Sequence, residues 1–312
     1  MTDLAGYLET RTEPSLAKAI AALATAAGRI SAEIRAPQGV LDAVAGDVNA
    51  DGDTQKALDV LADEIVLAAA RDAGAAAYMS EEREAAIPLA ADGDFIIASD
   101  PLDGSSNIGV NVSIGTIFSI LPTEGAELVA GREQLAAGFF VYGPQTTLLV
   151  TVGAGVASFR MDAKGDFHLI EDHVRIPQQA GEFAINAGNQ RYWLPPVQRY
   201  IAACVAGADG PRGRNFGQRW VGSLVADAWR IFCRGGVFLY LADTRDGYAD
   251  GRLRLVYEAA PVALLVEQAG GRATDGTGDI LDIIPTAVHQ RVPLVFGSVE
   301  EVEEVGRQHA AG

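Results

Sequence analysis

The sequence predicts an α/β protein whose two halves arrange helices and strands differently. In the first half, helical periodicity gives way to short β-prone segments divided by turn signals, which is typical of an antiparallel meander. In the second half, strands and helices alternate. Because the pattern changes over residues 175–181, we expect two domains, residues 1–176 and residues 177–312.

The first half is expected to begin with two amphipathic helices, because apolar residues recur at three- and four-residue steps over 16–34 and over 58–69. Asp53 is positioned to cap the second helix, and Asp59 lies near its start. The Gly/Asp-rich stretch 46–53 is interpreted as a loop or lid. Strands are expected at 75–79 and 95–98, followed by meander strands at 112–121, 136–142, 146–152, 156–161 and 166–170.

The second half contains apolar residues with the spacing of helices in some segments and of strands in others. Pro261 and the pair Gly270–Gly271 bound one apolar helix, and Ser298 with Glu301 forms the capping-box pattern of a terminal helix. The remaining segments are strands expected at 183–186, 237–241 and 292–296, and helices expected at 195–205 and 221–232.

The composition limits the possible partners. With 24 Lys and Arg against 41 Asp and Glu, the formal net charge is −17, which argues against a nucleic-acid or anionic membrane surface. An anionic substrate then requires cations at its site. Two cysteines make no disulfide framework, the N-terminus has no signal-peptide pattern, and no apolar run reaches membrane-spanning length, so we expect a cytoplasmic protein.

The strongest chemical signal is Phe95-Ile-Ile-Ala-Ser-Asp-Pro-Leu-Asp-Gly-Ser-Ser-Asn107, a buried strand that runs into a turn. Such a turn aims the carboxylates of Asp100 and Asp103 and the carbonyl of Leu102 at one point. The backbone amides of Gly104, Ser105 and Ser106 then face an incoming anion. A second acidic pair, Glu81-Glu82, ends the preceding strand, and we expect the two strand ends to be neighbours in one sheet.

Acidic residues without nearby His or Cys predict a site for Mg²⁺, or for Mn²⁺, and not for zinc. Two or more such ions would clamp a phosphoryl group and activate a water for phosphate ester hydrolysis. The motifs of nucleotide phosphate loops, zinc proteases and serine hydrolases are missing, and the spacing of Asp100 and Asp103 does not fit an aspartyl-phosphate enzyme. The acids concerned are Asp53, Asp59, Glu81, Glu82, Asp100, Asp103 and Glu258.

A glycine-rich loop at 210–219 concentrates positive charge in this acidic chain. Arg219, which precedes a predicted helix, is the best candidate for a phosphate ligand. Arg212 and Arg214 are interpreted as part of a solvated basic loop.

Six segments, taken in chain order, closely resemble class 1 fructose-1,6-bisphosphatases of the inositol monophosphatase-like superfamily. They are Gly52-Asp-Thr-Gln-Lys-Ala-Leu-Asp-Val-Leu61, Ser80-Glu-Glu82, Asp100-Pro-Leu-Asp-Gly-Ser-Ser-Asn107 with Val112-Ser-Ile-Gly-Thr-Ile-Phe118, Val221-Gly-Ser-Leu-Val-Ala-Asp227, Gly251-Arg-Leu-Arg-Leu-Val-Tyr-Glu258, and Leu281-Asp-Ile-Ile-Pro-Thr286 with His289-Gln-Arg291. The resemblance covers nearly the whole chain.

The resemblance implies a layered α/β/α/β/α sandwich, the sugar phosphatase fold, and hydrolysis of the 1-phosphate of fructose 1,6-bisphosphate in gluconeogenesis or the Calvin cycle. It implies two or more Mg²⁺ ions per subunit and a homo-oligomer, a tetramer in the family. Glu82 and Asp59 would assist the attacking water, and Asp53 would lie on a loop that closes over the metals. The metal ligands it implies are Glu81, Glu82, Asp100, the Leu102 carbonyl, Asp103 and Glu258.

The same resemblance implies that Asp103, Gly104, Ser105 and Ser106 receive the 1-phosphate. Asn186, Arg219, Tyr240 and Arg252 would hold the 6-phosphate end, with Arg219 reaching toward a neighbouring subunit. This chain departs from the family where Trp220 and Asn189 replace phosphate-binding tyrosines and where Arg252 replaces a lysine. A site that also accepts sedoheptulose bisphosphate is therefore an open alternative.

Two further alternatives are an inositol monophosphatase-like phosphatase and a catalytically silent member that only binds a sugar phosphate. The first usually has Trp-Asp where this chain has Tyr257-Glu258, and nothing in the sequence favours the second. AMP-inhibited members carry motifs that this chain replaces with Glu13-Pro-Ser-Leu-Ala and Asp94-Phe95. We therefore expect weak or absent inhibition by AMP.

Overall fold

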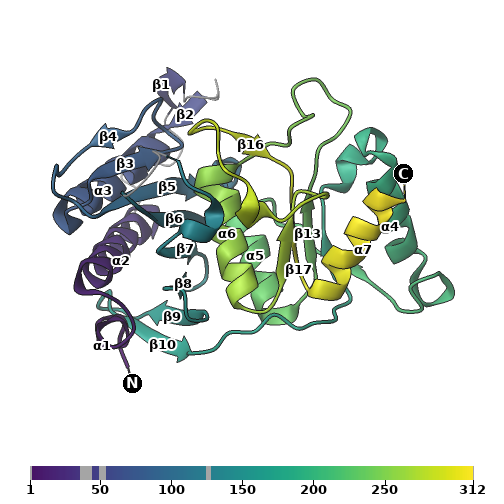
Figure 1. The fold of residues 1–312 in the computed structure, drawn as a ribbon, viewed down its shortest axis with the longest axis horizontal. Coiled ribbons are helices and arrows are strands. Elements are labelled where there is room, and N and C mark those ends of the chain that lie inside the picture. The colour runs from purple at the N-terminus through teal and green to yellow at the C-terminus, as the bar shows by residue number, and fades with distance from the viewer. Residues whose placement is uncertain (1, 36–43, 49–53, 124–127, 312) are drawn as a thin grey trace.

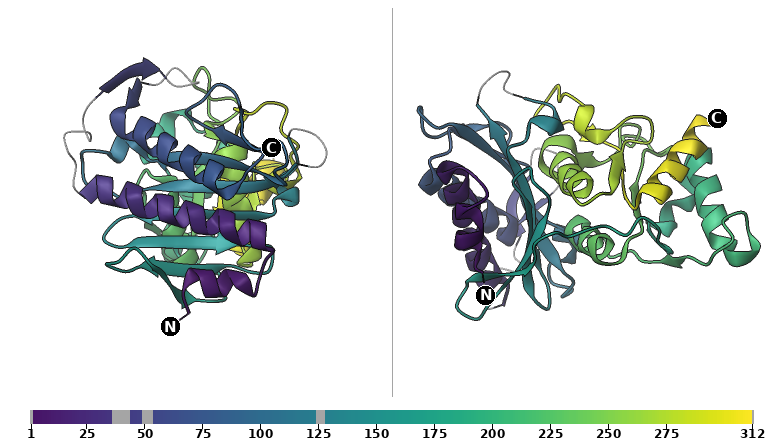
Figure 2. Two further views of the ribbon diagram at one scale, coloured as in Figure 1. Left: turned by 90° about the vertical axis from the view of Figure 1, so that its left-hand side faces the viewer. Right: turned by 60° about the horizontal axis from the view of Figure 1, so that its bottom comes forward.

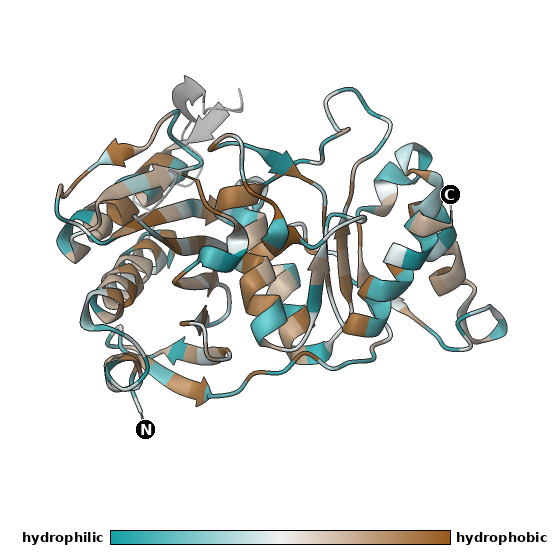
Figure 3. Cartoon of the chain, viewed as in Figure 1, coloured by the Kyte–Doolittle hydropathy of each residue, from teal (hydrophilic) through white to brown (hydrophobic). Residues whose placement is uncertain are grey.

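The computed structural model describes residues 2–35, 44–48, 54–123 and 128–311. These residues form five layers in the order helices, sheet, helices, sheet, helices (Figure 1). The layered α/β/α/β/α sandwich expected from the sequence is therefore confirmed. Figure 3 shows hydrophobic residues concentrated on the strands and on the helix at the centre of the stack.

The first layer consists of α1 (Leu4–Glu9), α2 (Pro14–Arg35) and α3 (Ala57–Ala73). The long helices lie side by side across the first sheet (Figure 2), and their apolar stripes form one core with it. Both expected helices are confirmed, whereas α1 was not expected because it is too short to show a period. A small hairpin joins β1 (Val44–Val48) to β2 (Thr54–Lys56), so part of the expected loop is a strand. Asp53 lies outside the described residues.

The first sheet has eight strands in the order β10-β9-β8-β7-β6-β5-β3-β4. The predicted meander is confirmed, because each strand from β5 to β10 pairs antiparallel with the next. The strands are β3 (Ala77–Ser80), β4 (Ile87–Pro88), β5 (Phe95–Asp103), β6 (Ile114–Pro122), β7 (Ala136–Tyr142), β8 (Thr146–Thr151), β9 (Ala157–Met161) and β10 (Phe167–Glu171).

The middle layer holds α5 (Leu224–Arg234) and α6 (Ala260–Gln268), which pack between the two sheets. The second sheet has the order β12-β11-β13-β17-β15, and α4 (Pro195–Val205) and α7 (Val299–Ala310) cover its outer face. Its strands are β11 (Glu182–Ala184), β12 (Gly217–Gln218), β13 (Val237–Tyr240), β15 (Arg272–Thr274) and β17 (Leu294–Gly297), and a separate pair joins β14 (Leu253–Arg254) to β16 (Arg291–Val292).

The expected domain junction between residues 176 and 177 falls between β10 and β11. It stays a prediction, because α5 and α6 follow the junction in the chain yet pack against the first sheet as well as the second. Among the described residues, no helix combines the length and the apolar character needed to cross a membrane.

The terminal helix begins differently from its expectation. Ser298 does not cap α7 with its side chain; its hydroxyl donates to the Pro177 carbonyl at 2.6 Å and accepts from the Gly236 amide at 3.0 Å. Glu301 does not reach back to the helix start. It is fully buried and accepts hydrogen bonds from the Tyr200 hydroxyl and the Arg212 guanidinium. Tertiary partners have therefore displaced the local capping box.

Candidate active site

Three carboxylates converge at the junction of the two halves. Glu81, Asp100 and Glu258 each offer an oxygen, and these oxygens all lie within 4.8 Å of one another. Two of them meet because β3 and β5 pair in parallel with Ser80 opposite Ser99, which sets Glu81 beside Asp100. The expectation that these strand ends are neighbours is confirmed. We call Glu81, Asp100 and Glu258 the carboxylate group.

Glu258 arrives from the second half on a π-helical turn, Leu255–Ala259, that leads directly into α6. Single π turns are rare and occur frequently at functional sites. The Glu258 carboxylate accepts a hydrogen bond from the Arg254 amide at 2.6 Å, which fixes its orientation across the wide turn.

Asp100 and Glu258 are buried, Glu81 is half-buried, and their negative charges repel one another. Burial raises the pKa of Asp100 well above its usual range, and the charges of Glu81, Asp103, Glu258 and Glu82 raise it further. Burial likewise raises the pKa of Glu258 to about 7, against the lowering effect of the Arg254 amide. Carboxylates forced together in this way are suited to a hard divalent cation, which would remove their repulsion.

The turn after Asp100 is not a free bend, because β5 continues to Asp103 with an irregular register between the two acids. Asp100 accepts from the Leu102 amide at 3.0 Å. From beneath, the Thr116 hydroxyl donates to the Pro101 carbonyl at 2.8 Å and pairs with the Tyr142 hydroxyl. These hydrogen bonds therefore fix the irregular end of β5 between Asp100 and Asp103.

Asp103, an expected metal ligand, lies outside the carboxylate group. Its carboxylate accepts from the Ser223 hydroxyl and from the Leu224 and Val225 amides at 2.8–3.2 Å, so it caps the N-terminus of α5. Burial raises its pKa while these three hydrogen bonds oppose the rise. Asp103 thus connects the turn of the first half to a helix of the second.

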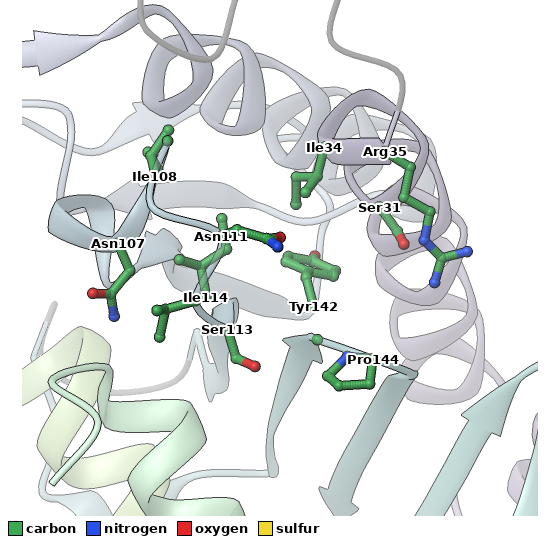
Figure 4. A pocket seen from close by; sticks show the side chains of 13 residues that line it. Ser31, Ile34, Arg35, Asn107, Ile108, Asn111, Ser113, Ile114, Tyr142 and Pro144 are labelled. Carbon is green, nitrogen blue, oxygen red and sulfur yellow. The ribbon is translucent and has the colours of Figure 1, made fainter.

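The residues expected to receive the 1-phosphate, Gly104, Ser105 and Ser106, follow Asp103 directly in the chain. Gly104 has φ +82°, and a Cβ there would lie 2.9 Å from the Ser223 Cβ, so only glycine fits. Ser105 begins a single 3₁₀ turn, Ser105–Asn107, and the Asn107 amide group donates to the Gly222 carbonyl. Beyond the turn, Asn107 borders a pocket that Arg35 and Tyr142 also line (Figure 4).

The two expected proton-handling acids lie on elements that adjoin the carboxylate group's first-half members. Glu82 follows β3, with its amide donating to the Ser80 hydroxyl at 3.2 Å, and its charge acts on Asp100. Asp59 is buried in the first turn of α3, which packs against β3 and β5.

Two buried residues near the site had no predicted role. Arg254 places its guanidinium 3.6 Å from the Glu81 carboxylate and donates to the Arg252 carbonyl. Asp227 accepts from the Val221 and Gly222 amides, and burial raises its pKa to about 6. Both residues could have been found from the family segments, because Arg254 lies four residues before Glu258 in one segment and Asp227 ends another.

The expected distal phosphate residues gather around the end of β13. Trp220 stacks on Phe238 at 5.5 Å between ring centroids and meets Tyr240 edge-on at 6.2 Å. Burial raises the pKa of Tyr240, and the charges of Arg252 and Glu258 act on it in opposite directions, so the distal residues adjoin the carboxylate group. Asn186 caps the 3₁₀ turn Ala187–Tyr192, and Asn186, Asn189 and Tyr240 line one pocket.

The three arginines of the glycine-rich loop have different surroundings. Arg212 and Arg214 both bind the buried Glu301, so the expectation of a solvated basic loop was wrong for them. Arg219 is exposed, and its guanidinium donates to the Gln218 carbonyl at 2.7 Å. Arg219 thus remains accessible on the surface of this chain.

Comparison with known proteins gives a consistent result. Residues 6–172 match the family described as "Fructose-1-6-bisphosphatase, N-terminal domain", and residues 176–310 match its "C-terminal domain". A class 1 fructose-1,6-bisphosphatase of Azorhizobium caulinodans is 56% identical over 84% of this chain and 83% of its own length. One from Methylorubrum extorquens is 50% identical over 97% and 92%.

A solved structure agrees with these relatives. The holo form of Leishmania major fructose-1,6-bisphosphatase superposes with a TM-score of 0.92 at 34% identity, covering 99% of both chains.

Proposed function

This chain belongs to the class 1 fructose-1,6-bisphosphatase family, and on that premise we propose that it hydrolyses the 1-phosphate of D-fructose 1,6-bisphosphate to give fructose 6-phosphate and phosphate. The observation that carries the proposal is the carboxylate group. Glu81, Asp100 and Glu258 converge from both halves beside the Asp103–Asn107 turn. Few structural needs explain two buried acids and a half-buried one at such a place.

The donor set fits Mg²⁺ or Mn²⁺. It offers only hard oxygen atoms, and burial together with neighbouring negative charges raises the pKa of Asp100 and of Glu258, an unfavourable situation that a cation relieves. We assign Glu81, Asp100 and Glu258 as ligands of two or more ions, with Glu82, the Leu102 carbonyl and Asp103 as further ligands. When bound, the ions supply charge neutralisation at the phosphoryl group and acidify the attacking water.

The residues of this chain supply orientation and proton handling. The Gly104, Ser105 and Ser106 amides hold the 1-phosphate at the turn that Asp103 anchors. Glu82 and Asp59 accept the proton of the attacking water. Asp53 lies outside the described residues, and its proposed part in catalysis rests on the family resemblance alone, which implies a loop that closes over the metals.

The distal residues set the substrate. Asn186, Tyr240 and Arg252 hold the 6-phosphate, and Arg219 reaches a neighbouring subunit of a homo-oligomer, a tetramer by analogy with the family. The exposure of Arg219 supports this last role. Because Trp220 and Asn189 lack tyrosine hydroxyls, the pocket is less committed to fructose, which favours sedoheptulose bisphosphate as a second substrate.

The decisive experiment measures phosphate release from fructose 1,6-bisphosphate with and without Mg²⁺ or Mn²⁺. We expect release only with the metal, and a loss of more than about a hundredfold in Glu81→Gln and Asp100→Asn. Glu64→Gln, which changes an exposed carboxylate on α3, is the matched control and should keep full activity.

Activity without metal, or full activity in both site variants, would overturn the proposal. Binding of the sugar phosphate without any release would indicate a catalytically silent member. Sedoheptulose 1,7-bisphosphate, assayed in parallel, decides between the narrow and the dual specificity.

A further inference from the structure

Two arginines stack on one tyrosine beside the proposed distal phosphate site. The Arg245 guanidinium lies 3.8 Å from the centroid of the Tyr248 ring, and the Arg252 guanidinium lies 5.0 Å from the same centroid. We call Arg245, Tyr248 and Arg252 the arginine–tyrosine stack. Contacts at these distances are attractive, because the ring face carries partial negative charge.

One end of the stack is anchored and neutralised. Arg245 forms an ion pair with the buried Asp243, with Nη2 2.5 Å from Oδ2, and its Nη1 donates to Asn189 Oδ1 at 3.2 Å. The Arg245 guanidinium also lies 5.2 Å from the centroid of Tyr192. The charge of Arg245 is therefore neutralised within the protein. Its role in the stack is to pack against the Tyr248 ring.

The other end of the stack keeps its charge. Within the described part of the chain, Arg252 forms no ion pair with a carboxylate, whereas Arg245 and Arg254 do. An uncompensated arginine in a chain of net charge −17 is available for an anionic ligand. Its guanidinium is half-buried, and its main partner is the Tyr248 ring.

Arg252 also lies in the right place. Its charge lowers the pKa of Glu258, a member of the carboxylate group, and of Tyr240 at the distal end of the site. Arg252 is therefore within electrostatic reach of both the carboxylate group and Tyr240, and the proposed distal phosphate needs such a cation. The Tyr248 ring lies against the planar guanidinium of Arg252 and can support it.

We propose that Tyr248 is a positioning residue that holds the Arg252 guanidinium flat for the distal phosphate of the substrate. This inference rests on the proposed function. It also explains why arginine and not lysine occupies position 252, since only the planar fork can stack on the ring and present two parallel donors to a phosphate. Arg245, held in place by Asp243, also packs on the ring.

The test is a double-mutant cycle on Tyr248 and Arg252. We expect Tyr248→Leu to raise the KM for fructose 1,6-bisphosphate about fivefold with kcat within about twofold, because distal binding is equal in ground and transition states. Tyr248→Phe keeps the ring and should behave as the wild type. In the Arg252→Lys background, Tyr248→Leu should add nothing, because the planar group that needs the platform is gone.

Tyr192→Leu is the matched control, because Tyr192 stacks on Arg245 but not on Arg252, and its KM should be unchanged. Additive effects of the two changes, or a Tyr248→Phe variant as weak as Tyr248→Leu, would overturn the inference. Thermal melting identifies a variant that fails to fold. If Tyr248→Leu fails to fold, the test rests on the KM values of Tyr248→Phe and Arg252→Lys.

Calorimetric binding of fructose 6-phosphate without metal separates this inference from the proposed function. About fivefold weaker binding in Tyr248→Leu supports the positioning role even if the protein releases no phosphate from the bisphosphate. Equal binding in the wild type and Tyr248→Leu overturns the role even in an active enzyme.

Discussion

The Asp103 carboxylate accepts a hydrogen bond of 2.8 Å from the Ser223 hydroxyl, across 120 residues of sequence. The same carboxylate accepts from two amides at the start of α5, where the helix dipole favours a negative charge. A residue expected to serve the metal therefore also joins the two halves of the protein. Catalytic and structural effects of changes at this turn should appear together.

Asp103→Asn tests that dual role. An asparagine turns one acceptor oxygen into a donor that faces the Ser223 hydroxyl or a helix amide, so we expect a loss of about 1–2 kcal/mol in the free energy of unfolding along with a loss of activity. Chemical denaturation and phosphate release measure the two effects. Ser223→Ala should reproduce about 1 kcal/mol of the stability loss while keeping most activity. Unchanged stability in Asp103→Asn would refute the capping role.

The buried carboxylates predict how metal-free protein responds to pH. Glu258 has a raised pKa of about 7 in the folded state, so between its ordinary value and 7 the folded state binds more protons than the unfolded state. The free energy of unfolding should therefore fall as pH rises through this window, by about 1.4 kcal/mol for each unit of pKa shift. Thermal melting in a chelator across pH 5–8 measures this slope.

Glu258→Gln provides the comparison for that experiment. The variant removes the buried charge, so its metal-free melting temperature should depend less on pH and should exceed that of the wild type near pH 8. Added Mg²⁺ should raise the melting temperature of the wild type and not of the variant. A steeper pH dependence in the variant would contradict the assignment.

Removing the Glu301 carboxylate, far from the carboxylate group, should strongly lower the free energy of unfolding. Its side chain is fully buried and joins α7 to Tyr200 of α4 and to Arg212 and Arg214 of the glycine-rich loop. Glu301→Ala leaves two guanidinium groups without their carboxylate, and we expect a loss of about 3–5 kcal/mol in unfolding free energy. Glu304→Ala, which removes a surface pair with Arg307, should cost less than about 1 kcal/mol.

The start of α2 predicts weak or absent inhibition by AMP. Ser15 donates its hydroxyl to the Asp94 carboxylate at 3.1 Å, and Glu13 precedes the helix, so a nucleotide phosphate would meet two acids there. Activity should persist in millimolar AMP at saturating Mg²⁺. Inhibition at micromolar AMP would contradict the expectation, and Asp94→Lys would then show whether that position controls it.

The sequence by itself determined the features that depend on neighbours along the chain. The period of the apolar residues identified α2, α3 and the meander, and the acids at the ends of β3 and β5 were predicted to meet because consecutive strands share a sheet edge. The tertiary structure decided what depends on contacts between distant segments. The π-helical turn brings Glu258 to Asp100, Asp103 is used to cap α5, and the buried Glu301 turns Arg212 and Arg214 from solvated charges into core ion pairs. No local pattern encodes such pairings, because their free energy comes from burial and partners that exist only after the layers have packed.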